Sequence, residues 1–264
     1  MRVGICSRRP ILQPCELQGH AYQLDPYVGC EHHCHYCYAL NQAETDWREE
    51  VLVHQDITAQ LDQELSPLEP QSIYIGWNSD PYQPAEATHQ HTRRVLTLLV
   101  ERGFSACILT KSDLITRDVD LFAQMPKPSL GFSIAFQDEG VRQLFELSAP
   151  PNERRIAALR ALKAAGLPTY VLICPVMPYI TDTRALIRTV APYADTIWIC
   201  GLALQAEGDR NWQNIRSILD RHFPELSDLY RQIAFSPRHP YWAALRQELC
   251  GYQRETQLNL RVEV

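Results

Sequence analysis

Short apolar segments alternate with amphipathic ones along this chain from about residue 70. The apolar segments are rich in β-branched and aromatic residues and have the length of strands buried on both faces. They are SIYIGW at 72–77, ACILT at 106–110, LGFSIA at 130–135, TYVLIC at 169–174 and TIWIC at 196–200. Strands that alternate with helices predict parallel β–α–β units.

Two of the segments between these strands carry helix signals. The segment 89–102 has an apolar face, with Thr88 as its expected N-cap and Gly103 at its end. The segment 152–166 also has an apolar face and stops at Gly166.

A further strand, AYQLDPYV, is expected at 21–28, which makes six β–α units. Six units in one sheet suit a TIM-type barrel better than two domains. We therefore predict an α/β fold, a partial (β/α)6 TIM-type barrel of parallel strands with a less regular helical C-terminal extension. Residues 1–264 are expected to form one domain, with the core barrel at about 20–204. The remainder, about 205–264, reads as helices and an alternating tail that cover the open side of the barrel.

The charge balance and the N-terminus bear on partners and location. The formal charge is −6, unlike that of proteins that neutralise many DNA phosphates, although a local basic groove on an acidic protein is compatible with DNA. The arginine pairs at 93–94 and 154–155 are expected on solvated helix faces. No apolar run reaches the roughly 18 residues of a membrane-spanning helix, and residues 1–15 lack the apolar region of a secretory signal. We expect a cytoplasmic protein with no membrane segment.

Nine cysteines are many for a cytoplasmic protein, in which disulfides are disfavoured. Four of them lie in apolar or helical sequence and are expected to be small buried core residues. These four are Cys107, Cys174, Cys200 and Cys250. Cys6 and Cys15 lie in loop-like sequence without a close pair, so a second metal site there is the less favoured reading.

Three further cysteines stand in YVGCEHHCHYCYAL at 27–40, directly after the first predicted strand. Cys30, Cys34 and Cys37 have the spacing C-x3-C-x2-C. One reading is a structural Cys3His zinc site, with His32, His33 or His35 as the fourth ligand. The other is a [4Fe–4S] cluster, in which three cysteines leave one iron open for an outside ligand. No second C-x2-C or H-x3-H pair occurs in the chain, and this favours the cluster.

Polar residues also follow the other predicted strands at their carboxyl ends, where the active sites of parallel barrels lie. They are Asn78, Ser79 and Asp80 after the second strand, Thr110, Lys111 and Ser112 at the third, and Ser133 with Gln137 at the fourth. One rim therefore combines metal ligands, a carboxylate, a lysine and hydroxyls, which is the layout of an active site.

Together these features resemble the radical S-adenosylmethionine (SAM) superfamily. C-x3-C-x2-C with an aromatic before the third cysteine is specific for that superfamily. DPYVGCEHHCHYCYA, DPYQPAE and ILTKSDLITRD resemble the spore photoproduct lyase-like group within it, and the resemblance runs from about residue 20 to 200. It implies a partial (β/α)6 barrel, with SAM chelated at the open iron and reductively cleaved to a 5′-deoxyadenosyl radical.

The resemblance also implies roles for individual residues. Cys30, Cys34 and Cys37 match the cluster ligands. Tyr36 matches an aromatic near the cofactor's adenine, and Tyr36 and Tyr38 occupy the places of two tyrosines implicated in radical transfer; plain packing is the alternative for both. Four further residues match groups that bind SAM: Lys111 its carboxylate, Ser79 and Asp80 its amino end, and Ser133 on the fourth strand. A reductant protein such as flavodoxin or ferredoxin is the expected partner.

One departure separates this chain from spore photoproduct lyase. The lyase carries a hydrogen-donor cysteine at the end of its second strand, and residues 76–82 here contain no cysteine. The function expected is hydrogen abstraction from a substrate by a radical SAM enzyme, with a DNA lesion lyase as one form of it. The alternatives are modification of a peptide, RNA or small molecule, or a zinc-stabilised binding module without catalysis.

Overall fold

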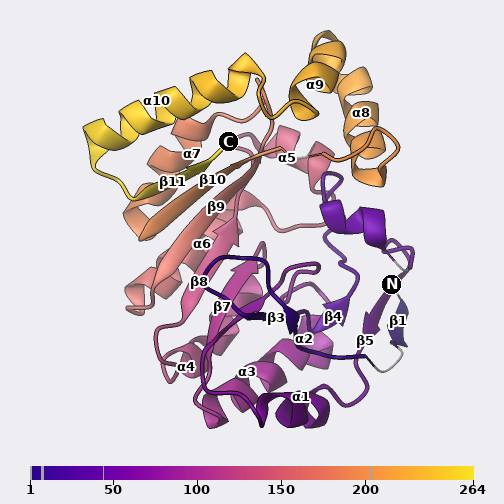
Figure 1. The fold of residues 1–264 in the computed structure, drawn as a ribbon, viewed down its shortest axis with the longest axis vertical. Helices are drawn as coiled ribbons and strands as arrows, with labels where there is room; N and C mark the ends of the chain where they lie inside the picture. The colour runs from indigo at the N-terminus through magenta and orange to yellow at the C-terminus, as the bar shows by residue number, and fades with distance from the viewer. Residues whose placement is uncertain (1, 7–8, 44, 203) are drawn as a thin grey trace.

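An eight-stranded sheet forms the centre of the fold in the computed structural model, which describes residues 2–6, 9–43, 45–202 and 204–264 (Figure 1). The strand order is β11-β10-β9-β8-β7-β6-β3-β2. The strands are β2 (Gln13–Pro14), β3 (Tyr22–Leu24), β6 (Ser72–Ile75), β7 (Ser105–Thr110), β8 (Ser129–Ser133), β9 (Thr169–Val176), β10 (Thr196–Gly201) and β11 (Leu260–Glu263). All neighbours pair in parallel except β2 and β3.

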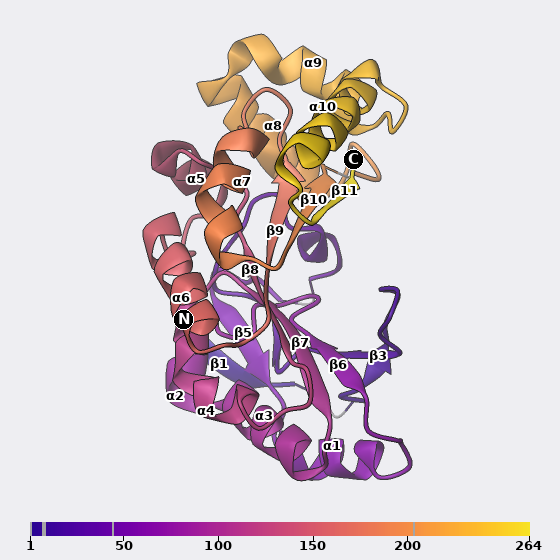
Figure 2. The same ribbon diagram turned by 90° about the vertical axis from the view of Figure 1, so that its left-hand side faces the viewer.

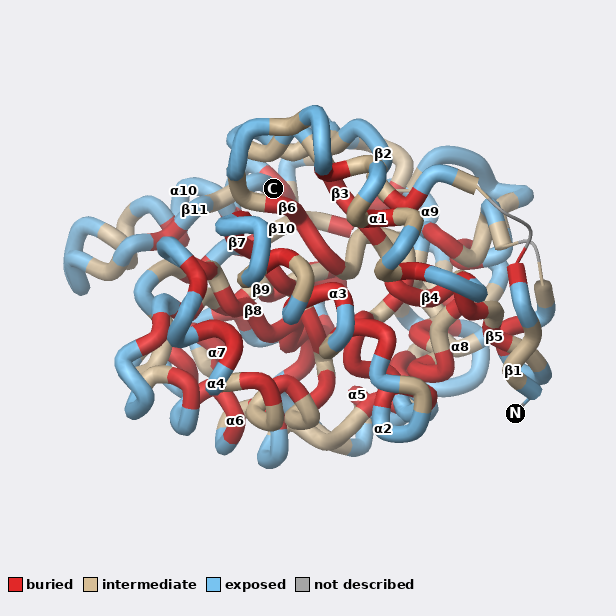
Figure 3. The backbone as a smooth tube through the Cα atoms, turned by 90° about the horizontal axis from the view of Figure 1, so that it is seen from below, coloured by how far each residue is buried: buried red, intermediate tan, exposed pale blue. Residues whose placement is uncertain are grey.

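The six predicted β–α strands therefore lie side by side in chain order, which confirms the parallel α/β fold. The strands are mostly buried (Figure 3), as their apolar sequences require. Helices α3, α4, α6 and α7 lie along one side of the sheet (Figure 2). The helices are α1 (Ile57–Leu65), α2 (Glu86–His89), α3 (His91–Glu101), α4 (Val119–Phe122), α5 (Glu139–Phe145), α6 (Asn152–Ala164), α7 (Thr183–Val190), α8 (Arg210–His222), α9 (Ser227–Ala234) and α10 (Pro240–Thr256).

A second, three-stranded sheet lies beside the first, in the order β1-β5-β4. It consists of β1 (Arg2–Ile5), β5 (Glu50–Val53) and β4 (Tyr27–Val28). The strand predicted at 21–28 is broken between β3 and β4, because Pro26 lacks an amide donor and Asp25 turns toward the neighbouring loop. This break directs the chain from the main sheet into the cysteine segment.

The helix predicted at 89–102 is also divided. Thr88 lies inside α2, and Gln90 has a φ of 52°, so α3 begins at His91. The Glu86 carboxylate accepts hydrogen bonds from the amides of Thr92 (2.9 Å) and Arg93 (3.1 Å). Glu86 therefore satisfies the free amides at the start of α3, the role predicted for Thr88.

The C-terminal region contains the expected helices, and its tail extends the sheet. In β11, Leu260 is paired with Ile197 and Glu263 with Cys200 of β10. The tail is thus a further parallel strand at the sheet edge. Among the described helices, none is long and apolar enough to cross a membrane.

The turn after β6 depends on Gly76, whose φ is 98°. A Cβ atom there would lie 2.8 Å from the Leu109 carbonyl oxygen and 2.8 Å from Cδ of Pro81. Gly76→Ala is therefore expected to lower the free energy of unfolding by about 1–3 kcal/mol, measured by urea denaturation.

The matched control for this change is Gly251→Ala, since Gly251 lies within α10 with no atom near its would-be Cβ. Alanine favours a helix, so this variant is expected to gain up to about 1 kcal/mol. Equal effects of the two substitutions would contradict the strain assigned to Gly76.

Candidate active site at the carboxyl ends of the strands

The cysteine loop, residues 29–37, leads from β4 toward a short 3-10 helix at Tyr38–Gln42. Its backbone is tied to the end of α5. The amide of His35 donates to the Phe145 carbonyl (2.8 Å), and Cys34 forms an antiparallel bridge with Glu146. The loop is also held from the other side, because the Gln83 side chain bonds the Gly29 carbonyl and the Glu31 amide. These contacts fix the loop independently of any metal.

The three thiols of this loop are buried or half-buried, and none forms a disulfide. Backbone amides point at two of the sulfur atoms: those of His32 and Asp80 at Cys30, and those of Ala39 and Leu40 at Cys37. Burial raises the pKa of all three thiols, to about 12 for Cys34. The amide hydrogen bonds oppose this rise at Cys30 and Cys37, and the Lys111 charge opposes it at Cys34.

This donor set fits a [4Fe–4S] cluster. Thiolates are the ligands of iron–sulfur clusters, and amide hydrogen bonds to sulfur are typical of such sites. Bound iron would hold the thiols in their charged form and so compensate for burial. Among the described residues, no three His, Cys, Asp or Glu side chains converge as a single metal ion would require.

Tyr36 is connected to a buried ion pair. Its hydroxyl donates to the Glu146 carboxylate, which forms a salt bridge with Arg155; the side chains of Glu146 and Arg155 are both 0% exposed. Arg155 Nη1 also donates to the Ser133 carbonyl oxygen at 2.9 Å. Lys111 Nζ lies 5.7 Å from the centroid of the Tyr36 ring. The structure thus places Lys111 beside the Tyr36 ring and connects Tyr36 to the backbone of Ser133 through Glu146 and Arg155.

The expectation for the pair at 154–155 is wrong for Arg155. Only Arg154 lies on an exposed face, where it pairs with Asp113. Arg155 is buried because Glu146, nine residues earlier, supplies a charge inside the protein. Sequence patterns did not single out Glu146, since no periodic signal distinguishes a buried glutamate from a solvated one.

Asp80 lies where it was predicted, but protein groups already contact both its oxygens. Thr110 Oγ1 donates to Oδ1 (2.6 Å), the Lys111 amide donates to Oδ2 (2.7 Å), and His32 Nδ1 lies 3.2 Å from Oδ2. Burial acts to raise the pKa of Asp80, yet His32 and these hydrogen bonds outweigh it and hold the pKa at about 2. Asp80 is therefore ionised and links the cysteine loop to the end of β7.

Ser79 is buried, and its hydroxyl donates to the Tyr27 carbonyl at 2.8 Å. Its amide and that of Asn78 both donate to the carboxylate of Asp25. Burial raises the pKa of Asp25 to about 6, although these hydrogen bonds oppose the rise. Asp25 is a rim residue that the sequence patterns did not single out; its place directly after the first strand, before Pro26, is the signal that points to it.

Tyr38 is the exposed member of the predicted tyrosine pair, with 46% of its surface accessible. Its hydroxyl donates to the Trp77 carbonyl, and the two rings lie 6.1 Å apart. Tyr36 contacts the buried Glu146–Arg155 ion pair, whereas Tyr38 is exposed near the carboxyl end of β6. The two tyrosines therefore occupy different environments.

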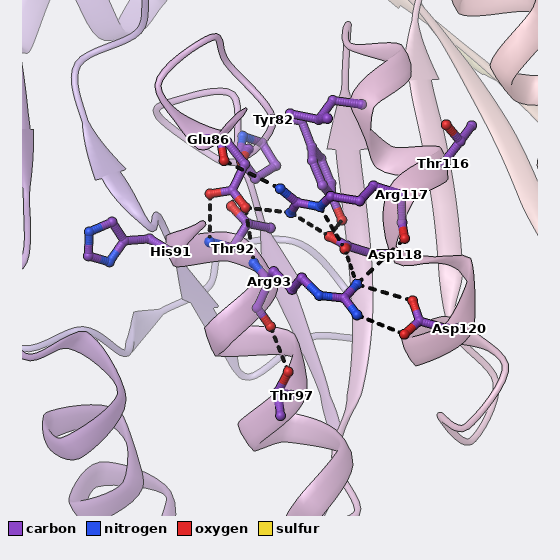
Figure 4. A network of polar contacts seen from close by, with 12 residues as sticks. Tyr82, Glu86, His91, Thr92, Arg93, Thr97, Thr116, Arg117, Asp118 and Asp120 are labelled. Carbon is purple, nitrogen blue, oxygen red and sulfur yellow. Dashed lines mark hydrogen bonds and ion pairs between the residues drawn. The ribbon is translucent and has the colours of Figure 1, made fainter. Parts of the chain in front are cut away.

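The segments DPYQPAE and ILTKSDLITRD meet in a polar network on the outside of the site (Figure 4). Arg117 bridges Glu86 (2.6 Å) and Asp118 (2.8 Å), while Tyr82 donates to Asp118 at 3.1 Å. Arg93 adds a second ion pair to Asp118. The network joins the loop after β6 to the loop after β7, which carry Asp80 and Lys111.

The remaining cysteines only partly follow expectation. Cys107 is buried as predicted, but Cys250 is exposed on α10, because it lies on the outward face of that helix. Cys174 and Cys200 are half-buried rather than core residues. Each alternates with a fully buried isoleucine, so their side chains project from the face of the sheet opposite the helices.

The sequence profile described as the radical SAM superfamily matches residues 24–189. An uncharacterized protein of Methanocaldococcus jannaschii is 29% identical over 227 residues, covering 84% of each chain. An uncharacterized protein of Mycobacterium bovis is 31% identical over 229 residues, covering 80% of this chain and 66% of its own.

Two solved structures have a similar fold. Spore photoproduct lyase complexed with dinucleoside spore photoproduct aligns with 99% of this chain and 81% of its own, with a TM-score of 0.66 and 18% identity. Streptococcus suis SuiB bound to S-adenosylmethionine aligns with 91% of this chain and 49% of its own, with a TM-score of 0.61 and 14% identity. The profile match spans more than half of the sequence and includes all three cysteines of the loop. This chain belongs to the radical SAM superfamily.

Proposed function

We propose that this chain reductively cleaves SAM at a [4Fe–4S] cluster held by Cys30, Cys34 and Cys37 and abstracts hydrogen from a substrate. Radical SAM enzymes use such a cluster together with SAM, and when bound these groups supply the organic radical. The observation that carries the proposal is the cysteine loop itself, which places three thiols at the rim of a parallel sheet, two of them facing backbone amides.

The residues around the loop bind and orient the cofactor in this proposal. Lys111 offers a cation to the carboxylate of SAM, and the Tyr36 ring beside it contacts the adenine. Ser79 and Asp80 bind the amino end, where Asp80 is already ionised. Ser133, at the end of β8, also binds SAM in this proposal.

The two tyrosines have separate roles in this scheme. The hydrogen bond to Glu146 fixes the Tyr36 ring and keeps its proton on the hydroxyl oxygen; burial and the nearby Glu146 charge raise the pKa of Tyr36 well above its usual value. Tyr38, exposed at the mouth, is the residue placed to exchange a hydrogen atom with a substrate. A one-electron donor protein such as flavodoxin or ferredoxin supplies the electron.

The test is an anaerobic reaction of the reconstituted protein with SAM and titanium(III) citrate. The proposal requires release of 5′-deoxyadenosine and methionine in amounts that depend on the reductant. Recovery of intact SAM from protein that carries a full complement of iron and sulfide would refute it.

Removal of the rim lysine is expected to weaken SAM binding. Lys111→Met takes away the only charge assigned to the SAM carboxylate, so the Kd measured by calorimetry should rise about 30-fold or more, which corresponds to about 2 kcal/mol. Lys163→Met is the control, because Lys163 pairs with Asp195 on the exposed surface. An unchanged Kd for Lys111→Met would remove Lys111 from the proposed site.

Cleavage of a DNA lesion is the second candidate function. It is favoured by the fold shared with spore photoproduct lyase over 99% of this chain, and one of those structures holds a dinucleoside spore photoproduct. Anaerobic incubation of the active protein with that dinucleoside should then consume it. If SAM is cleaved but the photoproduct is unchanged, the DNA lesion is excluded as the substrate, and the enzyme acts on a different class of molecule.

A further inference from the structure

Two cysteines that the proposed function does not use lie side by side at the carboxyl ends of strands β9 and β10. Strands β9 and β10 are parallel, with Ile173 paired to Ile199 and Val176 paired to Gly201. This register sets Cys174 next to Cys200, close enough for each thiol to shift the pKa of the other. Neither forms a disulfide.

The thiols lie on the same face of the sheet as the proposed SAM residues. Ser133 of β8 is paired with Leu172, and Leu172 is paired with Trp198. Cys174 and Cys200 follow two residues after Leu172 and Trp198, which places them on that face and one step nearer the carboxyl ends. The ammonium group of Lys111 is close enough to Cys174 to lower its pKa, and Cys174 also lies close enough to Tyr38 to affect the pKa of that phenol.

Other thiols of the described chain lie elsewhere. Cys107 lies nearer the amino ends of the strands, paired with Ser129 of β8. The sulfur of Cys107 is 3.9 Å from the hydroxyl of Tyr170. Cys250 is exposed on α10, and Cys6 is buried 3.4 Å from His54 Nδ1. The Cys15 amide donates to the Ala21 carbonyl, so Cys15 lies at the amino end of β3. Residues 76–82, at the end of β6, contain no cysteine. Cys174 and Cys200 are thus the thiols outside the cysteine loop that project from this face at the mouth.

We propose that Cys174 donates a hydrogen atom to a carbon-centred radical at the mouth of the sheet, with Cys200 as its partner. The inference rests on the proposed function, since it requires a radical. The carbon gains hydrogen as the S–H bond of Cys174 breaks homolytically, leaving a thiyl radical on its sulfur. One electron from the donor protein and one solvent proton then restore the thiol.

In this proposal Cys174 holds the hydrogen atom that is donated, and Cys200 stabilises the thiyl radical that remains. The hydrogen bond with Cys200, together with burial, raises the pKa of Cys174 well above its usual value, so Cys174 keeps its hydrogen at neutral pH. Hydrogen bonding to Cys174 lowers the pKa of Cys200. When Cys200 is ionised, its thiolate stabilises a thiyl radical on Cys174 by sharing the unpaired electron.

Heavy water provides the direct test. Thiol hydrogens exchange with solvent, so in D2O without substrate the 5′-deoxyadenosine released should carry one deuterium, measured by mass spectrometry per molecule formed. With titanium(III) citrate as a thiol-free reductant, Cys174→Ala and Cys174→Ser should both lose this label. Cys250→Ala, on the exposed face of α10, should retain it.

The possible outcomes separate the inference from the function on which it rests. Unlabelled 5′-deoxyadenosine from the wild-type protein, or a label that persists in both Cys174 variants, would overturn the role of Cys174 and leave SAM cleavage intact. Absence of 5′-deoxyadenosine in every sample would overturn the proposed function and this inference with it.

A second measurement tests the pair without SAM or activity. Anaerobic treatment with dithiodipyridine should give a peptide that links Cys174 to Cys200, and Cys200→Ala should give only a mixed disulfide at Cys174. If both cysteines react but no disulfide forms between them, the two sulfur atoms do not come into contact, and the proposed pairing is overturned.

Discussion

Cys34→Ala is expected to lose the brown colour of the anaerobically reconstituted protein and to reduce SAM cleavage to background. Cys34 lies in the middle of the cysteine loop and is buried, so no neighbouring residue can replace its sulfur without moving the backbone. Two thiols cannot hold a cubane cluster. The measurements are iron and sulfide content, visible absorbance and release of 5′-deoxyadenosine.

The control for that change is Cys250→Ala, which removes an exposed thiol from α10. It should retain the colour and the cleavage rate of the wild-type protein. A brown, active Cys34→Ala protein would exclude Cys34 as a cluster ligand. Circular dichroism of both variants is expected to match the wild type, because backbone hydrogen bonds to Phe145 and Gln83 hold the loop.

Arg155→Met is expected to have the largest effect on stability among the changes considered. It leaves the Glu146 carboxylate buried without its closest cation, and breaking such a pair costs about 3–5 kcal/mol. The free energy of unfolding should fall by this amount in urea denaturation. The Glu146 carboxylate that accepts the Tyr36 hydrogen bond also loses the cation that holds it in place, so the variant should bind SAM more weakly.

The neighbouring arginine provides the matched control. Arg154 pairs with Asp113 on the exposed surface, so Arg154→Met should cost less than about 1 kcal/mol. Similar losses for the two variants would contradict the buried pair. A change in SAM affinity with Arg154→Met would contradict the connection drawn from Arg155 to Tyr36.

The parallel sheet was predictable because its strands are buried on both faces. Such strands read as continuous apolar runs, and β6 to β10 all coincide with predicted segments. Strands β1 and β5 lack this signal, since β1 is largely exposed and β5 alternates between buried and half-buried residues. Strand β11 gains its order from pairing with β10, which is a long-range contact that local sequence does not encode.

The site was predictable where the chemistry is carried by rare residue types at fixed spacing. Three cysteines within eight positions stand out in any sequence, and the resemblance supplied Tyr36 and Lys111, which lie side by side in the structure, together with Ser133 on β8. Glu146, directly after α5, and Arg155, within α6, were missed because charged residues in and next to helices are normally solvated. The thiols at 174 and 200 were read as core, because strand alternation alone does not reveal which face stays open.

The claim that one iron of a three-cysteine cluster binds SAM is tested most directly by electron paramagnetic resonance. The reduced, reconstituted protein should show the signal of a [4Fe–4S] cluster, and addition of SAM should shift that signal. In Cys34→Ala the signal should be absent. A colourless protein with one zinc per chain, or a cluster signal that SAM leaves unchanged, would contradict the account.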